Sequence, residues 1–254
     1  MTATFPGFPP ETLDFFRKLK RNNNREWFLK NKKVFEEKVK APMVELVLAL
    51  GREMKQFAPE MGADPARAIY RIYRDTRFSN DKTPYKTHIA AVFTPRGMER
   101  HNCAGLYFHV APENVEIAGG IYMPSPESLL ALRRHIAGHH KKLRSIIESP
   151  EFRRMFGEVW GEKLVRTPKG FPADHPAAGL LRYKQMLADV SRPAELAGTP
   201  KLLPAIVELF RGMMPLIRFV NAPLAPLQLD APRKAGYETR PAAQLSRGRH
   251  TGRE

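Results

Sequence analysis

The sequence predicts an α+β protein, in which an antiparallel (or partly mixed) sheet from the middle of the chain packs against helices from both ends. Two observations indicate this class. Apolar residues recur at helical spacing near both ends, whereas residues 69–122 contain short β-branched and aromatic runs separated by turn residues. With 254 residues, 43% of them hydrophobic, the chain is long enough to bury a substantial core.

Three helices are predicted in the N-terminal part. The first starts at Pro10 and runs to about Lys20. Three asparagines, 22–24, break it, and a second helix begins near Arg25 and continues past Lys38. Pro42 is a favourable first-turn residue for the third helix. The apolar positions of that helix follow the helical period at Met43, Leu46, Val47, Leu50, Met54 and Phe57.

Strands are predicted in the middle of the chain, at Ile69–Arg74, His88–Phe93, Ala104–Val110 and Val115–Tyr122. The link APEN at 111–114 is typical of a tight hairpin, so we expect the last two of these strands to pair antiparallel.

Helices return in the C-terminal half. We expect one helix to begin at Ser125-Pro126-Glu127 and a short one to span about Pro150–Phe156. A third is expected to follow a cap at Asp174, with Leu180, Leu181, Tyr183 and Leu187 on one face. The last is expected to fill Pro204–Val220. Gly212 and Pro215 are expected to kink or interrupt the last helix.

The composition predicts a single domain over residues 1–222. From Asn221 onward the apolar period is lost, and residues 233–254 contain six Lys/Arg against Glu238 and Glu254. Such a segment cannot bury enough apolar surface to order itself, so we expect residues 223–254 to form a flexible basic tail.

The cellular setting follows from three features. The N-terminus has no basic region followed by an apolar core, so no signal peptide is predicted. The longest apolar run, around Met43–Leu50, carries Glu45 and is far shorter than the roughly 20 residues of a membrane span. The single cysteine, Cys103, excludes an internal disulfide framework. We therefore expect a soluble, cytoplasmic protein without a membrane partner.

The formal net charge of +16 favours association with polyanions such as nucleic acid. The segment Ile69–Lys86 concentrates this charge: it reads IYRIYRDTRFSNDKTPYK and holds five cations against Asp75 and Asp81, with aromatic residues between them. Guanidinium groups form planar forks suited to phosphate or carboxylate, and lysines add point charges. We predict an anion site for a phosphate-containing ligand or nucleic acid, formed by Arg71, Arg74, Arg77, Lys82, Tyr85 and Lys86.

Three alternatives stay open for this segment. It is a structural loop if Asp75 and Asp81 bridge the arginines, although three cations then lack a local partner. It orients a small anionic substrate if the protein is an enzyme, with His109 or Asp75 transferring a proton. It is a docking surface if the protein only binds an acidic partner.

Metal and cofactor chemistry are weakly indicated. Asp75 and Asp81 with Lys82 match a metal-dependent nuclease only if Glu113 or Glu116 supplies a third carboxylate. No P-loop, GxGxxG, HExxH or GxSxG pattern is present, which argues against common nucleotide-dependent enzymes and α/β hydrolases. The sequence assigns no particular cofactor.

A histidine pair gives the second metal hypothesis. His135 and His139 share a helix face at i, i+4 spacing, but no third ligand is evident. Lys141 and Lys142 follow, so these residues are better explained as complements to a helix C-terminal dipole. We predict no metal site.

Four segments in order carry a family resemblance: FPGFPPETLDFFRKLKRNNNREWF, RIYRDTRFSNDKTPYKTHIAAVF, GLYFHVAPENVEIAGGIYMP and KGFPADHPAAGLLRYKQ. Together they resemble a bacterial family of conserved hypothetical proteins, domain of unknown function 2461, from about Phe5 to about Val220. The resemblance implies one α+β domain of uncharacterised activity in the cytoplasm. It supplies no catalytic residues, and the basic tail lies outside it.

Overall fold

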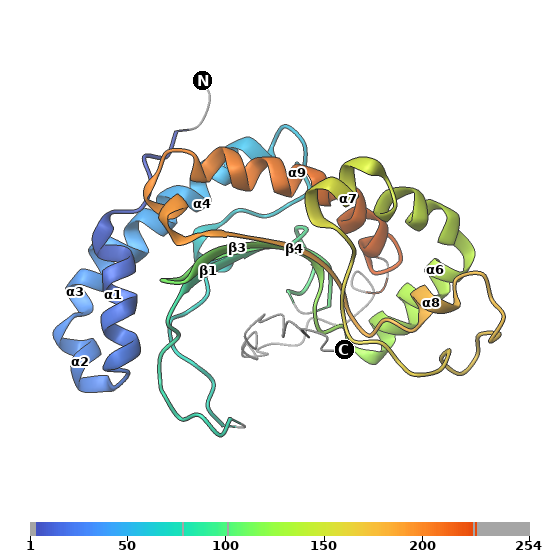
Figure 1. The fold of residues 1–254 in the computed structure, drawn as a ribbon, viewed down its shortest axis with the longest axis horizontal. Coiled ribbons are helices and arrows are strands. Elements are labelled where there is room, and N and C mark those ends of the chain that lie inside the picture. Colours follow the sequence, from blue (N-terminus) through green and yellow to red (C-terminus); the bar gives the residue numbers. More distant parts are fainter. Residues whose placement is uncertain (1–3, 78, 101, 226, 228–254) are drawn as a thin grey trace, which may run out of the picture.

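The computed structural model describes residues 4–77, 79–100, 102–225 and 227 (Figure 1). These residues have an α+β architecture, in which helices from both ends of the chain pack around one antiparallel sheet. The predicted fold class is confirmed.

The sheet contains four strands within the described residues, in the order β1-β2-β3-β4, and every neighbouring pair is antiparallel. Their bounds are β1 Ile89–Phe93, β2 Gly105–Val110, β3 Asn114–Ile121 and β4 Met186–Pro193. The predicted hairpin between β2 and β3 is confirmed, because the Ala111 N–H donates to the Asn114 carbonyl at 2.9 Å.

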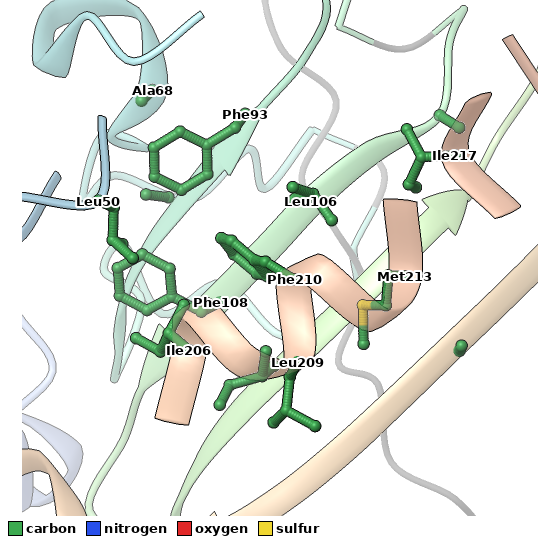
Figure 2. Close-up of a cluster of buried hydrophobic side chains, with 14 of the residues drawn as sticks. Leu50, Ala68, Phe93, Leu106, Phe108, Ile206, Leu209, Phe210, Met213 and Ile217 are labelled. Atoms are coloured by element: carbon green, nitrogen blue, oxygen red, sulfur yellow. The ribbon is translucent and has the colours of Figure 1, made fainter. Parts of the chain in front are cut away.

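Helix α9 (Leu202–Asn221) covers one face of the sheet and contacts β2 and β3. Figure 2 shows its Phe210 and Met213 pointing at the sheet, and the Phe93 and Phe210 ring centroids are 5.7 Å apart. Gly119 of β3 permits this approach, since a Cβ there would lie 2.8 Å from the Met213 sulfur. Each large apolar side chain buried here stabilises the fold by about 1.5–3 kcal/mol.

The predicted first and third N-terminal helices are confirmed, whereas the predicted second helix is divided at Asn31 and becomes π-helical from Phe35. The chain forms α1 Pro10–Arg21, α2 Arg25–Lys30, α3 Lys32–Val34, a π-helical turn at Phe35–Lys40, α4 Ala41–Met54 and the short α5 Pro65–Ala68. Asn24 begins α2, where its side chain accepts the Trp27 N–H at 2.9 Å. Helix α4 contributes Leu50 to the core under α9 (Figure 2).

The C-terminal half contains α6 Pro126–Ile147, α7 Pro150–Phe156, α8 Ala178–Leu181 and a 3₁₀ turn at Ala194–Gly198. The predicted starts of α6 and α7 are confirmed, because Ser125 and Ser149 cap them through their hydroxyls. Buried apolar side chains from Phe5 to Leu224 belong to one core cluster.

The predicted strand Ile69–Arg74 is wrong. Only isolated bridges form there, Ile69 with Ala91 and Tyr73 with Tyr85. Tyr70 still donates its N–H to the Ala90 carbonyl at 2.9 Å. The segment then leaves the edge of the sheet, so no regular ladder can continue.

The predicted helix after Asp174 is also wrong. It ends at Leu181, after four residues, and the chain then enters β4. Leu187, expected on the helix, instead exchanges two backbone hydrogen bonds with Trp160, at 2.8 and 3.0 Å. Leu187 also pairs with Gly120 of β3, so these residues are held as a strand by partners that are distant in the sequence.

The predicted interruption of the last helix is wrong as well, because α9 continues through Gly212 and Pro215. Pro215 is exposed, so the carbonyl that loses its partner faces water. A kink that the sequence did not predict lies in α6, at His139 (φ −129°, ψ 24°).

The predicted tail, 223–254, lies outside the described residues except for 223–225 and 227. None of the helices in the described part is both long and apolar enough to cross a membrane.

Candidate functional site

Residues 71–86 form a finger that leaves the sheet edge and returns to it (the teal segment extending below the sheet in Figure 1). Its two sides are joined by the hydrogen bonds Arg74 N–H to Pro84 O (2.9 Å) and Lys86 N–H to Ile72 O (2.8 Å). Tyr85 anchors the finger, because its ring is only 3% exposed and stacks on Phe28 at 4.2 Å. Tyr85 therefore belongs to the core rather than to the exposed surface of the finger.

The tip of the finger is neutralised locally. Arg77 binds Asp75 through two nitrogens, at 3.1 and 2.8 Å. Arg74 pairs with Asp81 and also contacts Thr83. Hydrogen bonds from these arginines hold the pKa of both aspartates at about 2.

Lys82, the remaining cation of the tip, donates to the Thr76 carbonyl at 3.0 Å. For Arg74, Arg77 and Lys82, the structural interpretation of the sequence therefore fits the observed contacts.

The base of the finger is different, because positive charges meet there around Tyr70. The Lys86 ammonium lies 5.2 Å from the centroid of the Tyr70 ring, and the Arg100 guanidinium lies 4.7 Å from it. Lys86 also donates to the Arg71 carbonyl at 2.8 Å. Within the described residues, none of these three cations forms an ion pair. We call Tyr70, Arg71, Lys86 and Arg100 the Tyr70 cluster.

The electrostatics of the cluster are unfavourable without a ligand. Burial, followed by the charges of Arg71 and Arg100, lowers the pKa of Lys86 to about 8. The lysine would hold its proton more tightly if an anion lay beside it.

Three members of the Tyr70 cluster, Tyr70, Arg71 and Arg100, line a groove of about 1080 Å³, which is bordered by the end of α4, by α5 and by residues 94–100. Lys86 does not line this groove and reaches it only through its contacts with Tyr70 and Arg71. The groove is strongly basic: its lining cations are Arg52, Lys55, Arg67, Arg71, Arg96 and Arg100. One lining carboxylate opposes them, Asp64, which lies 4.0 Å from Arg67. We call this cavity the basic groove.

The walls of the basic groove are fixed by backbone contacts. Gly62 donates to the Thr94 carbonyl at 2.9 Å, and Arg96 donates to the Glu60 carbonyl at 3.0 Å. Gly97 turns the loop with φ +84°, a conformation that favours glycine. The Glu60 carboxylate does not neutralise the groove, because it binds Arg218 at 2.7 Å, and that hydrogen bond lowers its pKa.

The floor of the basic groove is partly apolar. Ile69, Val92 and Met98 line it and are half-buried. The groove therefore combines a charged rim with apolar contact surface, an arrangement that suits ligands with both characters.

A polar hydrogen-bonded group continues from the Tyr70 cluster along the sheet. The Tyr70 and Tyr107 rings pack edge to face, with their centroids 6.3 Å apart. The Tyr107 hydroxyl lies 3.1 Å from His109 Nδ1, and the ring of His88 lies 4.9 Å from that of His109. On the next strand, Asn114 donates to Glu116 at 3.0 Å.

The two histidines of this group are held neutral at physiological pH. Burial lowers the pKa of His88 to about 3 and that of His109 to about 4. A base with a pKa near 4 is weak at pH 7, so His109 is poorly suited to the proton transfer considered from the sequence.

Metal-binding geometry is absent from the part of the chain that the structure describes, where no three His, Cys, Asp or Glu side chains form a suitable group. Glu113, one potential third ligand, pairs with Lys20 at 2.7 Å. His135 and His139 stack at 4.3 Å in the middle of α6. The sequence predicts that they lie at a helix C-terminus. In the structure α6 continues to Ile147, and only the kink at His139 divides it near these residues.

The structure separates the predicted anion-site residues. Arg71 and Lys86 meet in the Tyr70 cluster, whereas Arg74, Arg77 and Lys82 lie at the finger tip, and Tyr85 is buried. The sequence interpretation missed the other groove cations, Arg52, Lys55, Arg67, Arg96 and Arg100. The available signal was the run TPRGMER at 94–100, which looks like any exposed basic turn.

Comparison with known families gives one match. A family model described as conserved hypothetical protein (DUF2461) matches residues 11–219, which include every residue of the basic groove and the Tyr70 cluster. No curated protein matches this chain. The resemblance that the sequence motifs predicted is confirmed.

Proposed function

Because the chain belongs to the DUF2461 family of conserved hypothetical proteins, a description that names no activity, we propose a function from its geometry: the protein binds a phosphate-bearing ligand through the Tyr70 cluster. One observation supports this proposal most strongly. Lys86 and Arg100 lie over one aromatic ring, the charge of Arg71 acts on Lys86, and none of the three forms an ion pair among the described residues.

The charge of the cluster favours phosphate over a single carboxylate. A phosphate monoester carries about −1.5 to −2 charges at pH 7 and three strong acceptor oxygens. Three cations with planar or rotatable donors match that charge and number of acceptors better than they match one carboxylate. The same recognition serves a small phosphorylated molecule and a nucleic acid.

The competing function is an enzyme that acts on a small anionic substrate. Tyr107 and His109 favour it by position, since Tyr107 contacts Tyr70. Their chemistry favours binding instead, because His109 has a pKa of about 4 and Asp75, the other potential proton carrier, has a pKa of about 2. A third function, docking on an acidic partner, would use the finger tip, where aspartates already pair with the arginines.

A cytoplasmic location is part of this proposal. Phosphate-bearing metabolites and nucleic acids are available there, and Cys103 is suited to it as a buried, free thiol. Burial raises the pKa of Cys103 to about 12, so the thiol has no reactive role that we can assign.

The test is a calorimetric titration of inorganic phosphate into the full chain at pH 8, in two buffers with different ionisation enthalpies. A bound anion raises the pKa of Lys86 from about 8, so binding should take up as much as about half a proton. Lys86→Arg should bind phosphate without this uptake, because arginine stays charged. The difference between the two proteins removes any contribution from ionisation of phosphate itself.

A second variant tests the contact directly. Arg100→Gln should weaken phosphate binding by about 10- to 100-fold, the usual effect of losing a hydrogen bond to a charged group. Arg153→Gln is the matched control, since Arg153 is exposed on α7 and lines no part of the groove. Equal affinities for wild type and Arg100→Gln would overturn the proposal.

A further inference from the structure

We propose that the phosphate-bearing ligand is a single-stranded nucleic acid that lies along the basic groove, an inference that rests on the proposed function of the Tyr70 cluster. The cluster supplies one phosphate position, where Tyr70, Arg71 and Arg100 line the groove. The remaining cations supply further positions along it.

The distribution of charge indicates a polyanion. Of the six cations that line the basic groove, Arg67 alone forms an ion pair within the described residues, and its partner Asp64 is 4.0 Å away. Arg52 and Lys55 come from the last turn of α4 and the residue just after it, while Arg96 and Arg100 come from a separate loop. A single phosphate cannot neutralise six cations from different segments, whereas successive phosphates of one strand can.

The size of the groove favours a single strand over a duplex. About 1080 Å³ is more space than one phosphate fills and is near the upper end of pockets for drug-sized ligands. A duplex carries its phosphates on the outside of a wide, stiff cylinder, which cannot enter a recess between α4 and a loop. A single strand is flexible and narrow enough to follow the recess.

The floor of the groove distinguishes nucleic acid from other polyanions. Ile69, Val92 and Met98 present half-buried apolar surface between the charged walls. Bases and sugars have apolar faces that can cover this surface, whereas inorganic polyphosphate has none. Tyr70 is flanked by two cations, so it is not a free stacking platform, and we expect little sequence preference.

The experiment measures fluorescence anisotropy of labelled oligothymidylates of 2, 4, 8 and 12 nucleotides with the full chain at several salt concentrations. Affinity should rise with length until the groove is filled and then level off. If all six cations contact phosphates, the slope of log K against log salt approaches about −4, at about −0.7 per contact for single strands.

The variant Arg52→Gln/Lys55→Gln removes two cations of the basic groove that lie outside the Tyr70 cluster. It should reduce the magnitude of the slope by about 1.4, while the proton uptake on binding inorganic phosphate, which depends on Lys86, stays as in wild type. Lys141→Gln/Lys142→Gln is the control: it removes the same charge from exposed positions of α6, which does not line the groove, and should leave both measurements unchanged.

Several results would overturn the inference while the proposed function survives, because phosphate binding is measured separately. These results are affinity independent of length, equal affinity for inorganic polyphosphate or for a duplex of the same charge, and a slope unchanged in Arg52→Gln/Lys55→Gln. A slope reduced only by Arg247→Gln/Arg249→Gln would assign binding to the basic C-terminal segment and would also overturn it. Loss of phosphate binding itself would instead contradict the proposed function.

Discussion

Lys86 shows at the residue scale how position, rather than residue type, separates a ligand contact from a structural contact. Lys82 and Lys86 are four residues apart on the same finger, and each donates to a backbone carbonyl. Lys82 lies at the exposed tip, where Asp75 and Asp81 pair with the neighbouring arginines. Lys86 lies at the base in the Tyr70 cluster, where the charges of Arg71 and Arg100 act on it and no carboxylate pairs with it among the described residues.

The histidine pair on the sheet predicts a loss of stability in mild acid. The folded-state pKa values of His88 and His109, about 3 and about 4, are below the unfolded value of 6.5, mainly because of burial. The unfolded state therefore binds more protons between those values, and the unfolding free energy falls as pH drops through this window. Urea unfolding at pH 7 and pH 5 measures the effect.

The contribution of His109 can be isolated with His109→Gln, which should make stability less dependent on pH between 7 and 5. Asp75 and Asp81 contribute little between pH 7 and 5, because both stay largely ionised above their ordinary pKa of 3.8, and their folded-state pKa is about 2. A pH dependence that is the same in wild type and variant would show that His109 is not held neutral by the fold. Phosphate binding should survive this substitution, which separates the histidine from the Tyr70 cluster.

At the element scale, the pairing of β3 with β4 depends on a glycine. Gly120 has φ +134°, and a Cβ there would lie 2.1 Å from the Met186 carbonyl oxygen. Gly120→Ala should therefore lower the unfolding free energy by at least about 2 kcal/mol, through backbone strain and displacement of β4. Thermal or urea unfolding gives the value.

Gly138→Ala is the matched control, for which we expect the unfolding free energy to rise rather than fall. Gly138 lies inside α6, and a Cβ at that position meets no atom within 4 Å. Alanine should stabilise the protein there by about 0.5–1 kcal/mol, because glycine loses more backbone entropy in a helix. Equal effects of the two substitutions would contradict the close approach of β3 to β4.

The elements that the sequence predicted correctly are those with a strong local signal. Helices α4 and α7 have clear periodicity or an N-terminal cap, and β2 and β3 alternate around a recognisable turn. Strand β4 could not be found, because Met186–Pro193 has no alternation that distinguishes it from the apolar residues preceding it. Its strand conformation depends on pairing with β3, which is distant in the sequence.

The candidate site was predictable only in part, for the same reason. Arg71 and Lys86 stood out because they share one charged segment. Arg100 joins them from a different loop, and α4 supplies Arg52 and Lys55 from before the segment. Local charge density could not show that three segments meet at one groove, nor that Asp75 and Asp81 would pair with the arginines of the tip.

At the scale of the whole molecule, we propose that residues 1–222 form a single cooperative domain. Core residues from both ends of the chain pack in one cluster, and α9 lies on the sheet next to α4. The two tryptophans report on separate regions: Trp27 belongs to α2, whereas the Trp160 side chain donates to Asp189 of β4. Trp27→Phe and Trp160→Phe each leave one fluorescent reporter.

If the molecule is one domain, the two single-tryptophan proteins should each show one urea transition, and each should coincide with its own loss of helical circular dichroism. A comparison within each protein removes any change in stability caused by the substitution itself. Fluorescence of Trp27 and circular dichroism that change at different urea concentrations would show that the N-terminal helices unfold as a separate unit.

The central claim is that the Tyr70 cluster binds phosphate, and the proton taken up on binding at pH 8 tests it most directly. The account predicts that wild type binds inorganic phosphate with an uptake approaching about half a proton, because the pKa of Lys86 rises from about 8 when an anion is bound. Lys86→Arg should bind phosphate without that uptake. Phosphate binding with the same proton uptake in both proteins, or no binding by wild type at low salt, would contradict the account.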